Sequence, residues 1–354
     1  MLNWRMLEAG NALRRAIRKL PDWWLTPLFG AVGGYLASLI GWPLPWIIGS
    51  LLAVIAVRCG GCMLQEVPHG RATGQWLIAS AIGLHFTHEV MQQVLQHLGV
   101  ILAGALGTLL LSLIGIFVLL RSGTDRATAF FASLPGGASE MVNLASRHAA
   151  HPAKVAAAHS TRLLLVVLIV PALFTWSLPA VEAPPPAPVS WPWLAVLLPG
   201  GAVLAMLWKR LRQPNPWMLG PLTVCAVASV VFDLHIGLPE GLGQLGQWLI
   251  GCSLGCHFDR QFFRSAPAFL LRILLITLLA MLAATTLAAA LSWLTTLDGT
   301  SLMLGMMPGG ITELCLTAEA LQLSVALVTA LQVLRLFLVM FLAEPLFWLW
   351  QKRT

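Results

Sequence analysis

The sequence predicts an all-α, polytopic membrane protein with about ten transmembrane helices, arranged as two inverted repeats of five. Three observations lead to this fold class: the composition, an internal duplication and the distribution of Lys and Arg. Of the 354 residues, 58% are hydrophobic and only 10% are charged, which is not the balance of a soluble globular domain. Apolar runs such as 99–120 and 266–294 are long enough to cross about 30 Å of hydrocarbon, which takes roughly 20 helical residues.

The duplication is seen in four features that occur twice, in the same order, 171 to 173 positions apart. They are PWIIG at 45–49 with PWMLG at 216–220, GQWLI at both 74–78 and 246–250, LPGGASE at 134–140 with MPGGITE at 307–313, and Arg162 with Arg335. Conserved order at a nearly constant separation is the signature of an internal repeat. The chain therefore contains two copies of one unit.

The copies define the predicted domains. Residues 23–178 form the first membrane repeat and residues 192–354 the second, and the Pro-rich stretch 179–191 is the linker, since it can neither form a helix nor bury itself. Residues 1–22 alternate apolar and basic side chains at near-helical spacing, which predicts an amphipathic N-terminal segment lying on an anionic membrane surface.

Each copy is predicted to cross the membrane five times. The expected spans are 25–41, 44–58, 74–94, 98–120 and 154–178 in the first copy, and 192–208, 215–235, 244–259, 267–294 and 324–350 in the second. Residues 127–150 and 300–320, which contain the Pro-Gly-Gly motifs, are expected to be re-entrant or discontinuous helices that dip into the membrane and return to the same side.

This topology agrees with the positive-inside rule. With the N-terminus inside, nearly all of the 21 Lys and Arg residues fall in cytoplasmic segments, Arg162 and Arg335 fall within spans, and the outer segments have none. Both termini are therefore expected to be cytoplasmic. Because five is odd, the second copy is upside down relative to the first, as in secondary transporters.

The Pro-Gly-Gly motifs are the predicted centre of the site. Proline removes a backbone donor and glycine disfavours helix, so each motif should break the helix that passes through it. Broken helices at membrane depth line substrate sites, and inversion would bring the two breaks together. The candidate substrate- or ion-binding residues are Pro135, Gly136, Gly137, Ser139, Glu140 and Arg162 in the first copy, and Pro308, Gly309, Gly310, Thr312, Glu313 and Arg335 in the second.

Two roles remain open for the charged residues. Glu140 and Glu313 either cap the helices that restart after the glycines or handle substrate, ions or protons. Arg162 and Arg335 either form fixed ion pairs with these glutamates or bind an anionic or zwitterionic substrate. His159, which the second copy replaces with glutamine, is a candidate proton relay.

Several functions find no support. The six cysteines have no framework spacing, so no disulfides are expected, and the nine histidines form no ligand set that both copies share, so no metal is expected. No nucleotide-binding or catalytic signature occurs, so neither a cofactor nor an enzymatic reaction is expected. The net charge of +7 is spread over short loops and serves topology rather than nucleic-acid binding.

The paired motifs PGGASEM and PGGITEL, each followed about twenty residues later by an intramembrane arginine, resemble the AbrB family of bacterial inner-membrane proteins, in which this domain occurs twice. Some members are labelled regulators and some ammonia monooxygenases. The resemblance implies a multi-pass protein of the bacterial cytoplasmic membrane but no substrate. We expect a secondary transporter of a small solute, embedded in the lipid bilayer. The alternative is a membrane-bound regulator that acts through a partner, and a membrane monooxygenase is a weaker candidate. The protein is allowed to form a homo-oligomer.

Overall fold

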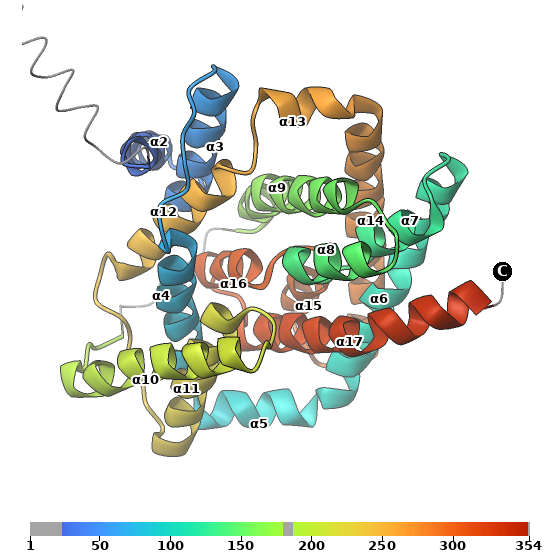
Figure 1. Ribbon diagram of the computed structural model, residues 1–354. Helices are drawn as coiled ribbons and strands as arrows, with labels where there is room; N and C mark the ends of the chain where they lie inside the picture. Colours follow the sequence, from blue (N-terminus) through green and yellow to red (C-terminus); the bar gives the residue numbers. More distant parts are fainter. Residues whose placement is uncertain (1–22, 180–186, 353–354) are drawn as a thin grey trace, which may run out of the picture.

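The structure is a computed structural model that describes residues 23–179 and 187–352, and all regular secondary structure in these residues is α-helical (Figure 1). The prediction of an all-α protein is confirmed for this part of the chain. The predicted amphipathic segment 1–22, residues 180–186 of the linker and residues 353–354 lie outside the described residues.

The helices follow the two copies along the chain. In the first copy they are α2 (Leu25–Leu39), α3 (Pro45–Cys59), α4 (Gly70–Leu84), α5 (His88–Gln96), α6 (Leu98–Arg121), α7 (Arg126–Ser133), α8 (Ala138–Arg147) and α9 (Pro152–Ser177). In the second copy they are α10 (Trp191–Arg210), α11 (Pro216–Phe232), α12 (Leu242–Gly255), α13 (Arg260–Ser265), α14 (Pro267–Trp293), α15 (Gly299–Met306), α16 (Ile311–Ala320) and α17 (Val325–Lys352). Every helix of the first copy thus has an equivalent in the second.

Five described helices are long and apolar enough to cross a membrane: α6, α9, α10, α14 and α17. The helices α2, α3 and α11 are apolar but shorter. Exposed leucine, valine and phenylalanine side chains cover the outside of these elements, for example Leu110 at 65% and Val196 at 66% exposure. Such an apolar surface suits a lipid environment and would be a liability in water.

Two predicted spans were wrong in extent. The expected helix 74–94 is interrupted, because α4 ends at Leu84 and the side chain of Thr87 caps a new helix, α5, by accepting a 3.4 Å hydrogen bond from the Val90 amide. The expected helix 244–259 likewise ends at Gly255, and Asp259 caps α13 with a 2.7 Å bond from the Phe262 amide. An N-cap residue satisfies amides of the first turn and so fixes where the new helix starts. The polar residues that follow each cap, His88-Glu89 and Arg260-Gln261, mark the same junctions in the sequence.

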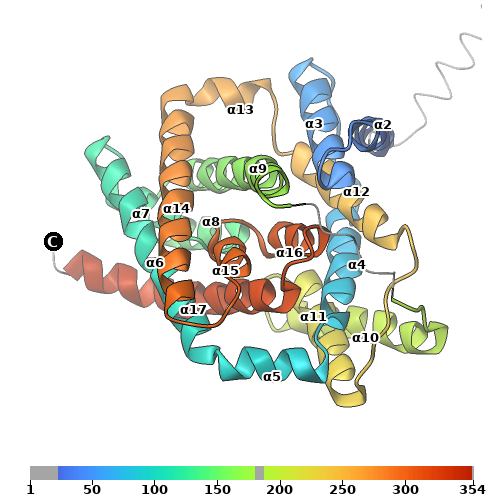
Figure 2. The same cartoon turned by 180° about the vertical axis from the view of Figure 1, so that it is seen from behind.

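The helices form two bundles. The first bundle packs α2, α3 and α4 with α10, α11 and α12, and the second packs α6, α7, α8 and α9 with α14, α15, α16 and α17. The short helices α5 and α13 connect the bundles and lie at opposite edges of the molecule in both views (Figures 1 and 2). Each bundle therefore draws equivalent helices from both copies.

The contacts within the first bundle are reciprocal. A Cβ on Gly74 would lie 2.7 Å from the carbonyl oxygen of Gly246, and a Cβ on Gly246 would lie 3.1 Å from that of Gly74. These glycines open the two GQWLI motifs, so α4 and α12 cross closely at equivalent residues. Such a crossing tolerates only glycine, because any Cβ would displace the facing backbone.

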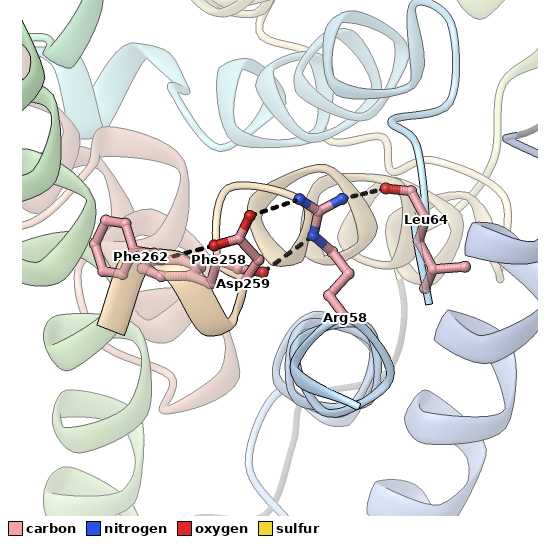
Figure 3. A network of polar contacts seen from close by, with 5 residues as sticks. All are labelled: Arg58, Leu64, Phe258, Asp259 and Phe262. Carbon is pink, nitrogen blue, oxygen red and sulfur yellow. Dashed lines mark hydrogen bonds and ion pairs between the residues drawn. The ribbon is translucent and has the colours of Figure 1, made fainter. Parts of the chain in front are cut away.

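An arginine network fixes one of the connectors to the first bundle (Figure 3). The Arg58 guanidinium, at the end of α3, donates a 3.1 Å hydrogen bond to the Phe258 carbonyl, bonds the Leu64 carbonyl and lies 3.6 Å from the Asp259 carboxylate. Asp259 is the cap of α13, so Arg58 holds the point at which the chain leaves the first bundle for the second.

Candidate functional site

Both Pro-Gly-Gly motifs interrupt a helix, as predicted. The backbone is extended at Leu134 and Gly137, between α7 and α8, and at Met307 and Gly310, between α15 and α16. Each interruption therefore leaves carbonyl groups without a helical partner, and these groups need another donor.

Each broken element also returns to its starting point. The Thr128 hydroxyl, in the first turn of α7, accepts a 2.8 Å hydrogen bond from the His151 amide just before α9. The equivalent bond in the second copy, 3.0 Å long, joins the Ser301 hydroxyl to the Ser324 amide just before α17. The chain thus runs along one short helix to the break and returns along the next to the level at which it began, so each broken element is a helical hairpin.

The two arginines supply the donors that the breaks lack. Arg162 donates to the carbonyls of Ser133 and Leu134 at 3.4 and 3.1 Å. Arg335 donates to the carbonyls of Met307 and Gly309 at 2.7 and 2.9 Å. A guanidinium carries five N–H donors in a rigid fork, so it can satisfy several carbonyls of one exposed turn.

The expected ion pairs between these arginines and Glu140 or Glu313 are therefore not formed. The ion pairs within residues 23–179 and 187–352 join Arg58 to Asp259, His148 to Glu344 and His151 to Asp125. A buried arginine does not require an anion here, because backbone carbonyls freed by a helix break are adequate acceptors.

His159 and Gln332, at equivalent positions, hold the arginines in the same way. The His159 Nδ1 atom lies 2.7 Å from Nη2 of Arg162, and its Nε2 atom lies 3.0 Å from the Phe131 carbonyl. Gln332 accepts from Arg335 through its oxygen and donates 2.7 Å and 3.2 Å bonds to the carbonyls of Gly305 and Met307.

This geometry fixes the histidine tautomer. Because Arg162 can only donate, the His159 Nδ1 atom must be the acceptor, and Nε2 then carries the proton that is donated to Phe131. A neutral imidazole in this tautomer presents one acceptor and one donor, as the Gln332 amide does. The contacts describe a positioning role, and the proton relay stays a prediction.

The glutamates fold back over the glycines that precede them. Glu140 and Glu313 are the third residues of α8 and α16, and their carboxylates lie beside the N-cap glycines. A Cβ on Gly137 would lie 2.0 Å from Oε2 of Glu140, and a Cβ on Gly310 would lie 2.1 Å from Oε2 of Glu313. An acidic side chain at the third position is placed to interact with a helix N-terminus, so the arrangement suits the capping role.

The two copies differ in how much of this turn they bury. Ser139 is exposed and Glu140 half-buried, whereas Thr312 and Glu313 are only 3% and 7% exposed. The Thr312 hydroxyl lies 3.6 Å from the Met218 sulfur, across the boundary with the first bundle. The first-copy turn therefore faces open space, and the second-copy turn is packed against α11.

A cavity of about 400 Å³ lies between the breaks, which we call the central cavity. It is lined by all thirteen residues that the sequence singled out: Pro135, Gly136, Gly137, Ser139, Glu140, His159, Arg162, Pro308, Gly309, Gly310, Thr312, Glu313 and Arg335. As the sequence predicted, residues of both Pro-Gly-Gly motifs lie together around one cavity.

The sequence missed the opposite wall of the central cavity, which the first bundle supplies. Arg71 and Gln75 come from α4, and Asn215 precedes α11. The Gln75 side chain donates a 3.2 Å hydrogen bond to the Asn215 side chain, whereas Arg71 has no hydrogen bond or ion pair with a described residue. Gln75 belongs to a duplicated motif, so a signal existed, but Arg71 looked like an ordinary cytoplasmic-loop cation.

A second cavity, of about 720 Å³, lies at the other end of α16. We call it the distal cavity. The first turn of α16, at Thr312 and Glu313, lines the central cavity, and its last turn, at Glu319 and Ala320, lines the distal cavity. Gln247, the equivalent of Gln75, lines the distal cavity. The wall of the central cavity contains three arginines, and that of the distal cavity contains no Lys or Arg.

Comparisons with known proteins identify the family of this chain. The sequence model of the family described as "Transition state regulatory protein AbrB" matches residues 46–351, which include both breaks and both arginines. The chain is 29% identical to the "Uncharacterized protein YhjN" of Bacillus subtilis over 362 residues, covering 93% of this chain and 92% of that protein. It is also 29% identical to the "Putative regulator AbrB" of Escherichia coli over 317 residues, covering 86% and 88%. The chain belongs to the AbrB family.

Proposed function

We propose that the protein is a secondary transporter of a small anionic or zwitterionic solute, built from two inverted repeats and working by alternating access. The observation that carries the proposal is the placement of the two equivalent glutamines. Gln75 lines the central cavity at one end of α16 and Gln247 lines the distal cavity at the other. Equivalent residues at opposite ends of a buried helix are what two inverted repeats around one site would produce.

The reciprocal packing of the first bundle supports the inversion. Suppose that a residue of the first copy contacts a residue of the second, and that the equivalents of these two residues also contact each other. The two copies are then related by an approximate two-fold axis. A Cβ built on Gly83 would lie 2.8 Å from the Leu222 carbonyl oxygen. A Cβ built on the equivalent Gly255 would lie 3.0 Å from the carbonyl oxygen of Leu51, the equivalent of Leu222. The positions of α5 and α13 at opposite edges are consistent with such an axis.

The location of the central cavity supports movement between two states. Its walls come from both bundles, and the bundles are joined through α5, α13 and the linker. Ligand sites between two bundles that can rock against each other are the usual basis of alternating access. In this proposal the central cavity opens to the cytoplasm, because Gln213 on its wall directly follows the basic run at 209–212. Both termini are then cytoplasmic. The proposed transport moves the solute without chemical change.

A counterflow experiment tests the proposal. Purified protein is screened by thermal shift against inorganic anions, carboxylates and amino acids, because a ligand that binds the folded state raises its melting temperature. Compounds that stabilise the protein are then loaded into proteoliposomes, and exchange of the labelled compound is followed. We expect exchange of at least one stabilising compound and its loss in Glu313→Gln. Stabilising compounds that never exchange would contradict transport.

The name of one relative favours a second candidate. The Escherichia coli protein is called a regulator, which suggests a membrane-bound regulator acting through a partner. A strain whose chromosomal copy carries Glu313→Gln separates the two. If the protein regulates expression independently of transport, transcripts in this strain should match those of wild type and differ from those of a deletion strain. Transcripts that match the deletion strain would assign any regulatory effect to the transported solute.

A further inference from the structure

An apolar chamber of about 340 Å³ adjoins the central cavity. It lies between α3 and α12 of the first bundle and α8 and α9 of the second, and the central cavity shares part of its wall. The shared residues are Arg71, Ala138, Ser139, His159 and Leu163. The two spaces therefore adjoin along a common boundary that contains the Arg71 side chain.

The two spaces differ in chemistry. The central cavity is lined by arginine, glutamate and amide side chains, whereas the chamber is lined mainly by aliphatic and aromatic ones. Its apolar wall consists of Leu51, Val142, Leu164, Val167, Leu254 and Phe258. Small-molecule sites typically combine an apolar pocket with a few polar groups that fix orientation, and their volumes run from about 300 to 1,000 Å³.

Arg71 is the group that would orient a ligand across this boundary. The donors of Arg162 and Arg335 are engaged by the carbonyls of the helix breaks. Arg71 lines both spaces and has no hydrogen bond or ion pair with a described residue. An arginine with free donors binds a carboxylate through two parallel hydrogen bonds.

The chamber is bounded in part by first-copy residues whose second-copy equivalents pack directly against each other. Its walls include Val142 and Ala156, whose equivalents in the second copy are Cys315 and Thr329. There the cysteine sulfur lies 3.1 Å from the threonine hydroxyl, and both residues are at most 1% exposed. Arg71 likewise has Gly243 as its equivalent. The cation and the apolar space thus occur together, on the same side of the site.

We propose that the ligand of this site is an organic monocarboxylate with an apolar chain or ring, whose carboxylate binds Arg71 at the central cavity and whose apolar part fills the chamber. The inference rests on the proposed function and narrows its solute to one chemical class. It makes the chamber part of the binding site rather than a gap between bundles.

Binding of a homologous series to the purified protein tests the proposal. The probes are acetate, butyrate and hexanoate, with hexanamide as the neutral analogue, and binding is measured by equilibrium dialysis in detergent. Burial of each methylene should tighten binding about fourfold, so the dissociation constant should fall steadily from acetate to hexanoate. Hexanamide should bind at least about tenfold more weakly than hexanoate, because it lacks the charge that Arg71 recognises.

Variants separate the two parts of the ligand. Ala156→Phe fills the chamber and should remove the advantage of hexanoate over acetate. Val142→Phe serves the same purpose if the first variant does not fold. Ala103→Phe, on the exposed surface of α6, is the matched control and should keep the wild-type series. Arg71→Gln should weaken acetate and hexanoate alike and leave hexanamide unaffected.

Binding that does not depend on chain length would overturn the inference, and so would binding of hexanoate that survives both chamber-filling variants. A third contrary outcome is a phospholipid that native mass spectrometry detects in the purified wild-type protein and not in Ala156→Phe. Failure of the proposed transport function can be told apart from failure of this inference, because equilibrium dialysis measures binding without a membrane and proteoliposomes measure transport. Chain-length-dependent binding without exchange in proteoliposomes would contradict transport alone, and exchange of acetate without chain-length dependence would contradict the inference alone.

Discussion

The guanidinium of Arg335 donates a 2.7 Å hydrogen bond to the carbonyl oxygen of Met307, the C-cap residue of α15. The first copy has the same contact, from Arg162 to Leu134 at 3.1 Å. Each arginine therefore takes over, from another helix, part of the hydrogen bonding that the Pro-Gly-Gly motif removes. This explains how extended backbone persists in the apolar interior of the second bundle.

Arg335→Lys should destabilise the protein by about 2–4 kcal/mol. A lysine has one ammonium group and cannot reach Met307, Gly309 and Gln332 together, so buried acceptors lose their donor. Thermal unfolding of the purified variant measures the effect. The exposed Arg264→Lys is the control and should stay within about 0.5 kcal/mol of wild type. Equal melting temperatures for the two variants would show that the breaks do not depend on the arginine.

His159→Gln tests whether the histidine positions Arg162 or carries protons. Glutamine already fills the equivalent position, 332, where it both accepts from the arginine and donates to a carbonyl. His159→Gln should therefore cost less than about 1 kcal/mol in unfolding free energy, whereas His159→Leu, which leaves Phe131 and Arg162 without their partner, should cost about 2–3 kcal/mol.

The same variants assign the function of the histidine. If His159 only holds Arg162, the pH profile of flux should be unchanged in His159→Gln, because the amide keeps both hydrogen bonds. A flux that loses its pH dependence while the protein stays as stable as wild type would establish the proton relay instead.

The sequence predicted the helix breaks and the residues around them, since Pro and Gly act locally and the duplication marks their partners. The predicted continuous helices 74–94 and 244–259 were wrong, although polar residues follow the caps Thr87 and Asp259, His88 and Glu89 in one case and Arg260 and Gln261 in the other. The sequence also failed to place Arg71 in the site. Arg71 lies in the first turn of α4, and whether a residue at a helix end faces a cavity depends on how the two bundles pack, which the spacing of motifs along the chain does not specify.

Gly310→Ala should destabilise the protein by about 1–3 kcal/mol. The new Cβ would lie 2.1 Å from the Glu313 carboxylate, so the side chain must leave its place beside the helix N-terminus. The double variant Gly310→Ala, Glu313→Ala should recover part of that loss, since the carboxylate is then absent. Gly99→Ala, where a Cβ meets nothing within 4 Å, is the control and should be neutral or stabilising. Thermal unfolding compares all three variants with wild type.

Two double-mutant cycles on Arg335 distinguish its structural partner from a functional one. Gln332 accepts a hydrogen bond from Arg335, so the variants Arg335→Gln and Gln332→Leu should show a coupling of about 0.5–3 kcal/mol in unfolding free energy. Glu313 forms no ion pair with Arg335 among the described residues, so Arg335→Gln and Glu313→Gln should be additive within about 0.5 kcal/mol.

Ligand binding by the same variants completes the test. Glu313 lines the central cavity without contributing to the arginine network, so Glu313→Gln should lower flux or ligand affinity about tenfold or more while the melting temperature changes little. Ser301→Ala, which removes a buried hydroxyl away from that cavity, should lower the melting temperature and leave ligand affinity unchanged. A Glu313→Gln variant that loses stability and keeps full ligand affinity would show that Glu313 only caps α16 and does not take part in ligand binding.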